Sequence, residues 1–137
     1  THVNSKSKKI DYEIFDPSEA LSDNAILSLE EKFLAGEGQN ITPARFHSNP
    51  AINKQITSKV KKEFEKAAKV LKIEGYSRID AFVKVFENNV PEVVFIEANS
   101  LPGMTPATCI FHQCALNGYK PFDFIDKIIE YGSKKHE

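Results

Sequence analysis

The feature that most constrains the fold is a pair of strand-like runs, residues 77–87 and 90–99, joined at Asn88-Asn89. Both runs are rich in β-branched and aromatic residues, which favour extended backbone. Asparagine tolerates a positive φ angle, so the two asparagines predict a tight turn between antiparallel strands. Pro91 argues against the tightest turn, and a longer loop would shift the pairing by one step.

The segment before this hairpin, residues 50–73, has the clearest helical pattern in the chain. Its apolar residues recur every three or four positions, while lysines fill the opposite side. These apolar residues are Ile52, Ile56, Val60, Phe64, Ala67 and Leu71. We expect this helix to cover one face of the sheet, which predicts an α+β fold: an antiparallel sheet packed against helices.

Two shorter helices are predicted after the hairpin, beside the sheet. The first spans about 106–117, with Thr105 as its cap and Pro106 in its first position. The second runs over 121–131 and ends before Gly132.

The N-terminal third gives weaker signals. A short strand is expected over 10–15, and Asp16 with Pro17 resembles the start of a helix. Residues 24–35 have helical propensity and are followed by a loop rich in glycine.

Composition excludes several classes of protein. The chain has 137 residues, 41% of them hydrophobic, which suits one domain or part of one with a real core. Its net charge of -1 gives no basic field for nucleic acid. No apolar run approaches the roughly 18 residues that span a bilayer. Cys109 and Cys114 do not share a helix face, so free thiols and a cytoplasmic location are expected.

Four polar residues come together if the hairpin pairs as predicted. A two-residue turn places Asp80 opposite Glu97 and Arg78 opposite Asn99. Alternation along the strands puts all four side chains on one face. Two opposed carboxylates repel each other, so a positive charge must compensate.

The residues alone leave two explanations for that positive charge. Arg78 can neutralise a surface acid pair that has no further function. A hard divalent cation such as Mg²⁺ would compensate better, because Asp80, Glu97 and Asn99 offer only oxygen ligands. Zinc is not expected, since no histidine or cysteine sits among them.

The loop after the second strand adds a candidate anion site. Thr105-Pro106 is predicted to open a helix, and Gly103 leaves its backbone N–H accessible. A metal, amide donors and Arg78 are the groups that phosphoryl transfer requires. The alternative is an ordinary turn into a capped helix.

These motifs carry a family resemblance. "GYSRIDAFV" and "VVFIEANSLPGMTPAT" are similar to the C-terminal part of the D-alanine–D-alanine ligases, which belong to the ATP-grasp superfamily. The matching elements are Arg78-Ile79-Asp80, Glu97-Ala98-Asn99 and Pro102-Gly103-Met104-Thr105. The resemblance is convincing over about 41–133. It implies a metal-binding ATP-grasp subdomain at 41–137, preceded at 1–40 by a lid or insertion segment.

The resemblance implies a role for each matching residue. Asp80, Glu97 and Asn99 would bind two Mg²⁺ or Mn²⁺ ions. Arg78 and the N–H of Gly103 would stabilise the phosphates of ATP and a tetrahedral intermediate. Thr108 stands where the family commonly uses serine to hold the carboxylate of the second substrate.

The segment "EEKFLAGEGQNITPA" resembles the family's lid over the active site. Lys32 would reach the ATP phosphates, and Phe33 would contact substrate where tyrosine is usual. Phenylalanine at this position also occurs in ligases that make D-alanyl-D-lactate.

The resemblance covers only part of such an enzyme. A Gly-rich phosphate loop is absent from the sequence, which predicts that the N-terminal and central domains of the parent enzyme are missing. The fragment alone is then expected to be inactive. The implied substrates are D-alanine or a similar molecule and ATP, in cytoplasmic peptidoglycan biosynthesis, and a homodimer stays open. The alternatives are a ligase with another acceptor and a non-catalytic ATP-grasp module.

Overall fold

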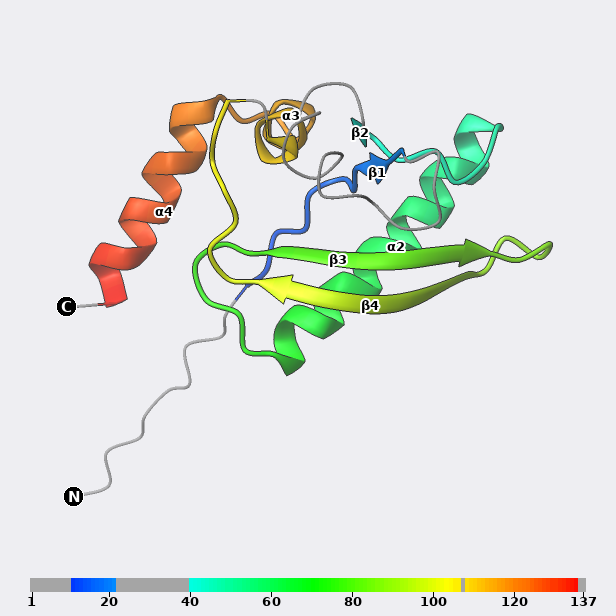
Figure 1. Ribbon diagram of the computed structural model, residues 1–137, viewed down its shortest axis with the longest axis horizontal. Coiled ribbons are helices and arrows are strands. Elements are labelled where there is room, and N and C mark those ends of the chain that lie inside the picture. Colours follow the sequence, from blue (N-terminus) through cyan, green and yellow to red (C-terminus); the bar gives the residue numbers. More distant parts are fainter. Residues whose placement is uncertain (1–10, 22–39, 107, 136–137) are drawn as a thin grey trace, which may run out of the picture.

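A computed structural model describes residues 11–21, 40–106 and 108–135. Its elements in chain order are β1 (Glu19–Ala20), β2 (Asn40–Ile41), α2 (Pro50–Val70), β3 (Arg78–Val85), β4 (Pro91–Asn99), α3 (Cys109–Leu116) and α4 (Pro121–Lys135). Strands β1 and β2 form one small antiparallel sheet, and β3 and β4 form another. Helices pack beside them (Figure 1), which confirms the predicted α+β class.

Helix α2 begins at a well-formed cap. The side chain of Asn49 accepts hydrogen bonds from the backbone N–H groups of Ala51 and Ile52, and Pro50 occupies the first turn. The helix ends at Val70, three residues earlier than predicted, because Lys72 takes a left-handed conformation with φ 52°.

The β3–β4 hairpin differs from the predicted hairpin at its turn. The N–H of Phe86 bonds to the carbonyl of Val90, so three residues rather than two form the connection. Asn89 carries the positive φ, 57°, that the turn requires. The prediction of a two-residue turn was therefore wrong by one residue.

A β-bulge reverses the one-residue shift in pairing that the longer turn causes, and it does so before the polar end of the hairpin. Ala81 pairs with Phe95, but the preceding residue Asp80 pairs with Glu97, which leaves Ile96 as the extra residue. Beyond the bulge the register is the predicted one, with Arg78 opposite Asn99.

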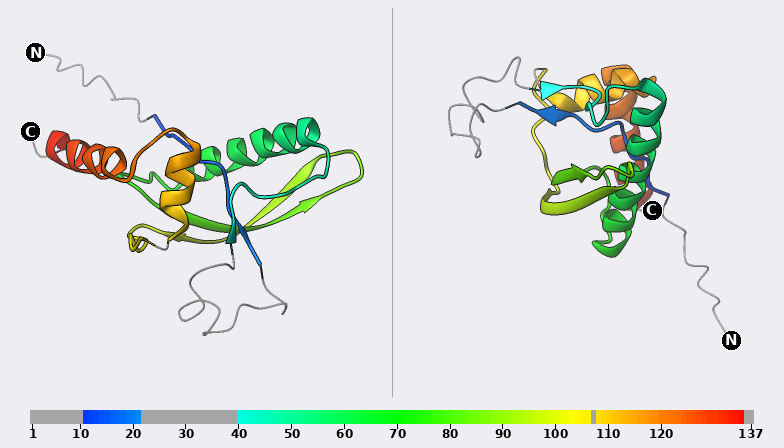
Figure 2. Two further views of the ribbon diagram at one scale, coloured as in Figure 1. Left: turned by 90° about the horizontal axis from the view of Figure 1, so that it is seen from above. Right: turned by 90° about the vertical axis from the view of Figure 1, so that its right-hand side faces the viewer.

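Helix α2 covers one face of the hairpin, and Figure 2 shows the two as separate layers. The rings of Phe64 and Phe95 meet edge to face, with centroids 5.2 Å apart. Ile56 and Val60 are fully buried on the same helix. The opposite face of the sheet is open, with exposed apolar side chains at Phe82, Val94 and Ile96.

Residues 11–21 form neither the strand nor the helix that their sequence suggested. Residues 11–18 have no regular structure, and β1 follows at Glu19–Ala20. The helix prediction was wrong because its capping residues have distant partners. Asp16 pairs with Lys61 of α2 at 2.9 Å, and Glu19 pairs with Arg45.

Long-range contacts fix this segment against the rest of the chain. The N–H of Ala44 bonds to the carbonyl of Pro17, and the hydroxyls of Ser18 and Thr42 lie 2.6 Å apart. Gln113 of α3 donates to the Ser18 hydroxyl. Residues 11–21 are therefore an integral part of the packed structure.

The two C-terminal helices occur as predicted, but their bounds differ. Helix α3 begins at Cys109 rather than 106, because the N–H of Thr108 closes a turn onto the carbonyl of Thr105. Helix α4 continues through Gly132 to Lys135 instead of stopping at 131. Its Phe124 is buried and packs against Phe15, with centroids 5.9 Å apart.

One ion pair gives a prediction about acid stability. Two hydrogen bonds from the Arg45 guanidinium lower the pKa of the Glu19 carboxyl below its ordinary value of 4.5, against a smaller opposing effect of burial. A carboxyl with a lowered pKa stabilises the fold above its unfolded pKa and loses that effect as pH falls through the folded pKa.

We therefore expect Glu19→Gln to lower the free energy of unfolding. The loss should be full at about pH 6 and should become smaller as the pH falls below about 4.5. Urea unfolding of both proteins across this range measures the difference. Arg45→Gln removes the partner of Glu19, so its loss of stability should depend on pH in the same way as that of Glu19→Gln. Equal losses at both ends of the range would contradict the assignment.

Candidate metal and phosphate site

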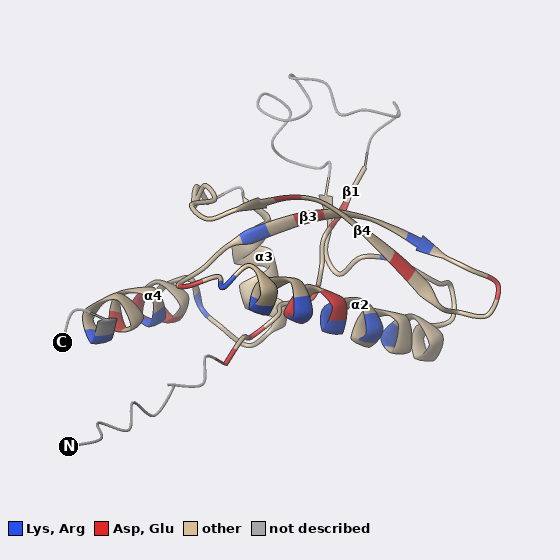
Figure 3. Cartoon of the chain, turned by 90° about the horizontal axis from the view of Figure 1, so that it is seen from below, with Lys and Arg blue, Asp and Glu red and all other residues tan. Residues whose placement is uncertain are grey.

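The candidate site lies at the end of the β3–β4 hairpin that is remote from its turn. Figure 3 shows basic and acidic positions on β3 and only acidic positions on β4. The bulge at Ile96 and the pairing beyond it bring Asp80 directly opposite Glu97. The predicted juxtaposition of the two carboxylates is therefore confirmed.

Arg78 bridges the two acids. Its Nε donates to Oδ1 of Asp80 at 3.0 Å, and its Nη2 donates to Oε1 of Glu97 at 3.4 Å. All three side chains are partly exposed: 50% for Arg78, 39% for Asp80 and 58% for Glu97. Water therefore reaches the cluster, and the two ion pairs hold it together weakly.

Asn99 completes the polar group at the end of β4. Its side-chain oxygen accepts a hydrogen bond from the N–H of Leu101 at 3.1 Å, which fixes the direction of the amide. The backbone carbonyl of Asn99 accepts a bond from the Ser77 hydroxyl at 3.0 Å. An amide oxygen has a second lone pair, so Asn99 keeps capacity for a cation.

The donor chemistry of these residues fits a hard divalent cation. Two carboxylates and one amide supply oxygen alone, which suits Mg²⁺ or Mn²⁺. Over residues 11–21, 40–106 and 108–135, no three or more His, Cys, Asp or Glu side chains gather as a metal site. Such an ion would thus need further ligands from water or substrate phosphates, as Mg²⁺ commonly does.

The loop after β4 is open where the anion site was predicted. Gly103 has no heavy atom within 4 Å of the position a Cβ would take. Pro102 beside it is buried and fixes the loop to the body of the protein.

The predicted helix start at Thr105-Pro106 was wrong. Thr105 lies before the helix, which has Thr108 as its N-cap residue. The Thr108 hydroxyl donates to the carbonyl of Thr105 at 2.7 Å, so it would have to turn before it could donate to a substrate. The backbone N–H groups of the first helical turn follow Thr108 directly.

Lys32 and Phe33, predicted to reach ATP and substrate, lie outside the described residues. Their placement relative to Asp80 and Glu97 therefore stays a prediction.

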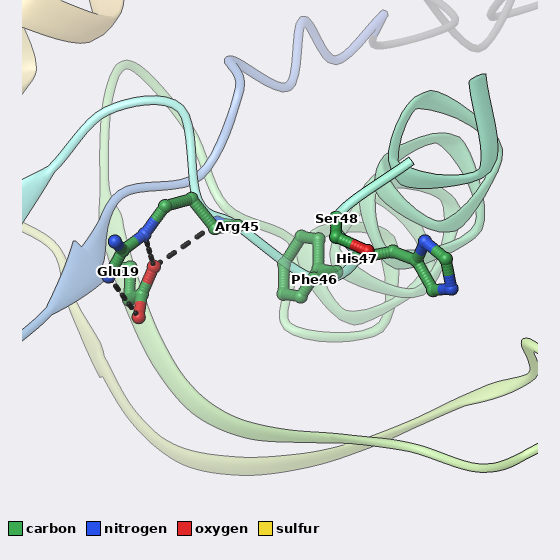
Figure 4. Close-up of a pocket in the computed structure, with 5 residues that line it drawn as sticks. All are labelled: Glu19, Arg45, Phe46, His47 and Ser48. Carbon is green, nitrogen blue, oxygen red and sulfur yellow. Dashed lines mark hydrogen bonds and ion pairs between the residues drawn. The ribbon is translucent and has the colours of Figure 1, made fainter. Parts of the chain in front are cut away.

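A pocket elsewhere was not predicted from the sequence. It is lined by Glu19, Arg45, Phe46, His47 and Ser48, as Figure 4 shows. The two charged side chains in it pair with each other at 3.0 Å. Glu19 and Arg45 are 26 positions apart, so no local sequence pattern could have identified their contact. None of the residues predicted to bind metal or substrate lines this pocket.

The cysteines show no sign of catalysis. Both are free thiols, and Cys114 is fully buried in α3. Burial raises the pKa of the Cys114 thiol, and the Glu13 carboxylate adds to that rise. A raised pKa suppresses the reactive thiolate, and the fully buried Cys114 contributes to packing.

Among the described residues, no helix combines the length and apolar character needed to cross a bilayer.

Comparison with known proteins gives consistent matches. The sequence model of the family described as "D-ala D-ala ligase C-terminus" matches residues 6–130. A D-alanine–D-alanine ligase of Flavobacterium johnsoniae is 34% identical over 82% of this chain and 31% of its own length. One from Parvibaculum lavamentivorans is 28% identical over 88% of this chain and 37% of its own. D-alanine–D-alanine ligase B of Clostridium perfringens is 39% identical over 65% of this chain and 28% of its own.

The chain thus spans about a third of the length of the curated relatives it matches. No solved structure matches it significantly. The family match covers the hairpin, its polar end, α3 and α4 up to residue 130. The chain therefore belongs to the family of D-alanine–D-alanine ligase C-terminal domains.

Proposed function

We propose that this chain is the C-terminal, metal-binding part of an ATP-grasp enzyme that joins two small molecules through an amide bond. The observation that carries the proposal is the pairing of Asp80 with Glu97, with Arg78 and Asn99 at the same end of the hairpin. The family match and the similarity to D-alanine–D-alanine ligases support the substrate class.

In the proposed reaction, ATP phosphorylates the carboxylate of one D-alanine. The amine of the second attacks the acyl phosphate, and the tetrahedral adduct collapses to an amide as phosphate leaves. Asp80, Glu97 and Asn99 would hold one or two Mg²⁺ or Mn²⁺ ions. A bound cation would neutralise charge on the transferring phosphoryl group.

The other residues would bind and orient the substrates. Arg78 would stabilise negative charge on the phosphates, and the N–H of Gly103 would donate to the tetrahedral oxyanion. Lys32 would contact the ATP phosphates and Phe33 the substrates. Thr108 would bind the carboxylate of the second substrate after its hydroxyl turns away from Thr105. The parent protein would supply the remaining nucleotide-binding and substrate-binding domains, and we place it in the cytoplasm.

A phosphate-release assay of the parent protein with ATP, Mg²⁺ and alternative acceptors tests this proposal. We expect release that depends on D-alanine, because an amine is the stronger nucleophile. Release only when D-lactate is added beside D-alanine would support a ligase that forms an ester, an alternative that the phenylalanine at position 33 keeps open. No release with any acceptor from a correctly folded protein would instead support a non-catalytic binding module.

A further inference from the structure

Arg78 lies where its positive charge compensates the negative charges of both acids of the candidate metal site. Its guanidinium bonds to Oδ1 of Asp80 and to Oε1 of Glu97, one oxygen of each carboxylate. The two acids lie opposite each other in the antiparallel ladder, so they would repel without it. The arginine is therefore the counter-ion of the pair in the absence of a metal.

The charges of this cluster make Arg78 a competitor of a metal ion. Two carboxylates and one guanidinium leave a net charge of -1, whereas the two carboxylates alone would present -2 to an incoming cation. A divalent ion bound to the same oxygens would lie roughly 5 Å from the guanidinium, close enough for strong repulsion. The side chain of Arg78 is half exposed, so it is free to move away.

We infer that Arg78 exchanges places with the divalent cation: it pairs with Asp80 and Glu97 until the cation binds, and is then released toward the anionic substrate. This inference rests on the proposed function of the site. It adds that the free cation binds weakly because Arg78 opposes it. A cation that arrives with a polyphosphate brings an anionic partner for the displaced guanidinium, so the two ligands assist each other.

Direct measurement of Mn²⁺ binding tests the exchange without any activity assay. Free Mn²⁺ is titrated by electron paramagnetic resonance against the 137-residue chain and its Arg78→Gln and Arg78→Lys variants. Removing the positive charge should tighten Mn²⁺ binding about fivefold at physiological salt. The lysine variant keeps the charge and should stay within about twofold of the original chain.

Two further variants serve as controls. Arg45→Gln removes an arginine that pairs with Glu19 instead, and should leave Mn²⁺ binding unchanged. Asp80→Asn should abolish binding, because it removes one of the two negative charges that attract the cation. Circular dichroism checks that each variant folds, and the uncharged Arg78→Met replaces the glutamine variant if that one misfolds.

The inference is overturned if the uncharged variants bind Mn²⁺ no more tightly than the original chain, or not at all at millimolar Mn²⁺. Binding that survives Asp80→Asn would place the ion elsewhere and overturn it too. A different result would contradict the proposed function: normal turnover by a parent protein in which Glu97 has lost its carboxylate. The two failures are therefore distinguishable.

Discussion

Replacing Glu97 by glutamine in the parent protein is expected to lower kcat/KM for D-alanine ligation by at least about 100-fold. The amide keeps the size of the side chain and one oxygen but loses the negative charge that would bind a divalent cation. Asp80→Asn should have an effect of the same order, because Asp80 is the cross-strand partner of Glu97. Phosphate release under steady-state conditions measures both losses.

Glu92→Gln is the matched control for this experiment. Glu92 lies on the same strand and is exposed, but it pairs with Lys84 near the turn of the hairpin. Its replacement should leave kcat/KM unchanged. If Glu97→Gln behaves like Glu92→Gln, the assignment of a metal to this end of the hairpin is wrong.

The largest effect on stability is expected at Ile56. This side chain is fully buried on the face of α2 that packs toward the hairpin. Ile56→Ala removes apolar contacts and leaves a cavity, which should lower the free energy of unfolding by about 2–5 kcal/mol. Urea unfolding of the chain measures this loss through the shift in the midpoint.

Val70→Ala provides the comparison on the same helix. Val70 is 80% exposed at the end of α2, so its replacement should change the free energy of unfolding by less than about 0.5 kcal/mol. Similar values for the two variants would show that α2 does not pack as described.

Local patterns were sufficient to predict the elements that surround the site. The apolar period of residues 50–73 identified α2, because packing on one face selects that spacing. The predicted two-residue turn placed Asp80 opposite Glu97, and this register holds because the bulge at Ile96 offsets the three-residue turn that the structure has. These features depend on residues that are near neighbours in sequence or that pair across one turn.

Features that depend on distant partners were not predictable in the same way. Asp16 and Pro17 have the local chemistry of a helix start, yet Lys61 and Ala44 bind them in an irregular segment. Thr105 and Pro106 also suit a helix start, but a turn closed by Thr108 delays α3 until Cys109. In both cases a tertiary or loop contact outweighed a preference of the local sequence.

The bulge at Ile96 has a consequence for how this hairpin can vary between relatives. The three-residue turn moves the pairing by one position, and the bulge moves it back before Asp80. An insertion or deletion at the turn alone would rotate the acids out of alignment or force a new irregularity in the strand. A variant whose turn is shortened by one residue is therefore expected to keep Asp80 opposite Glu97 only if it also loses the bulge residue.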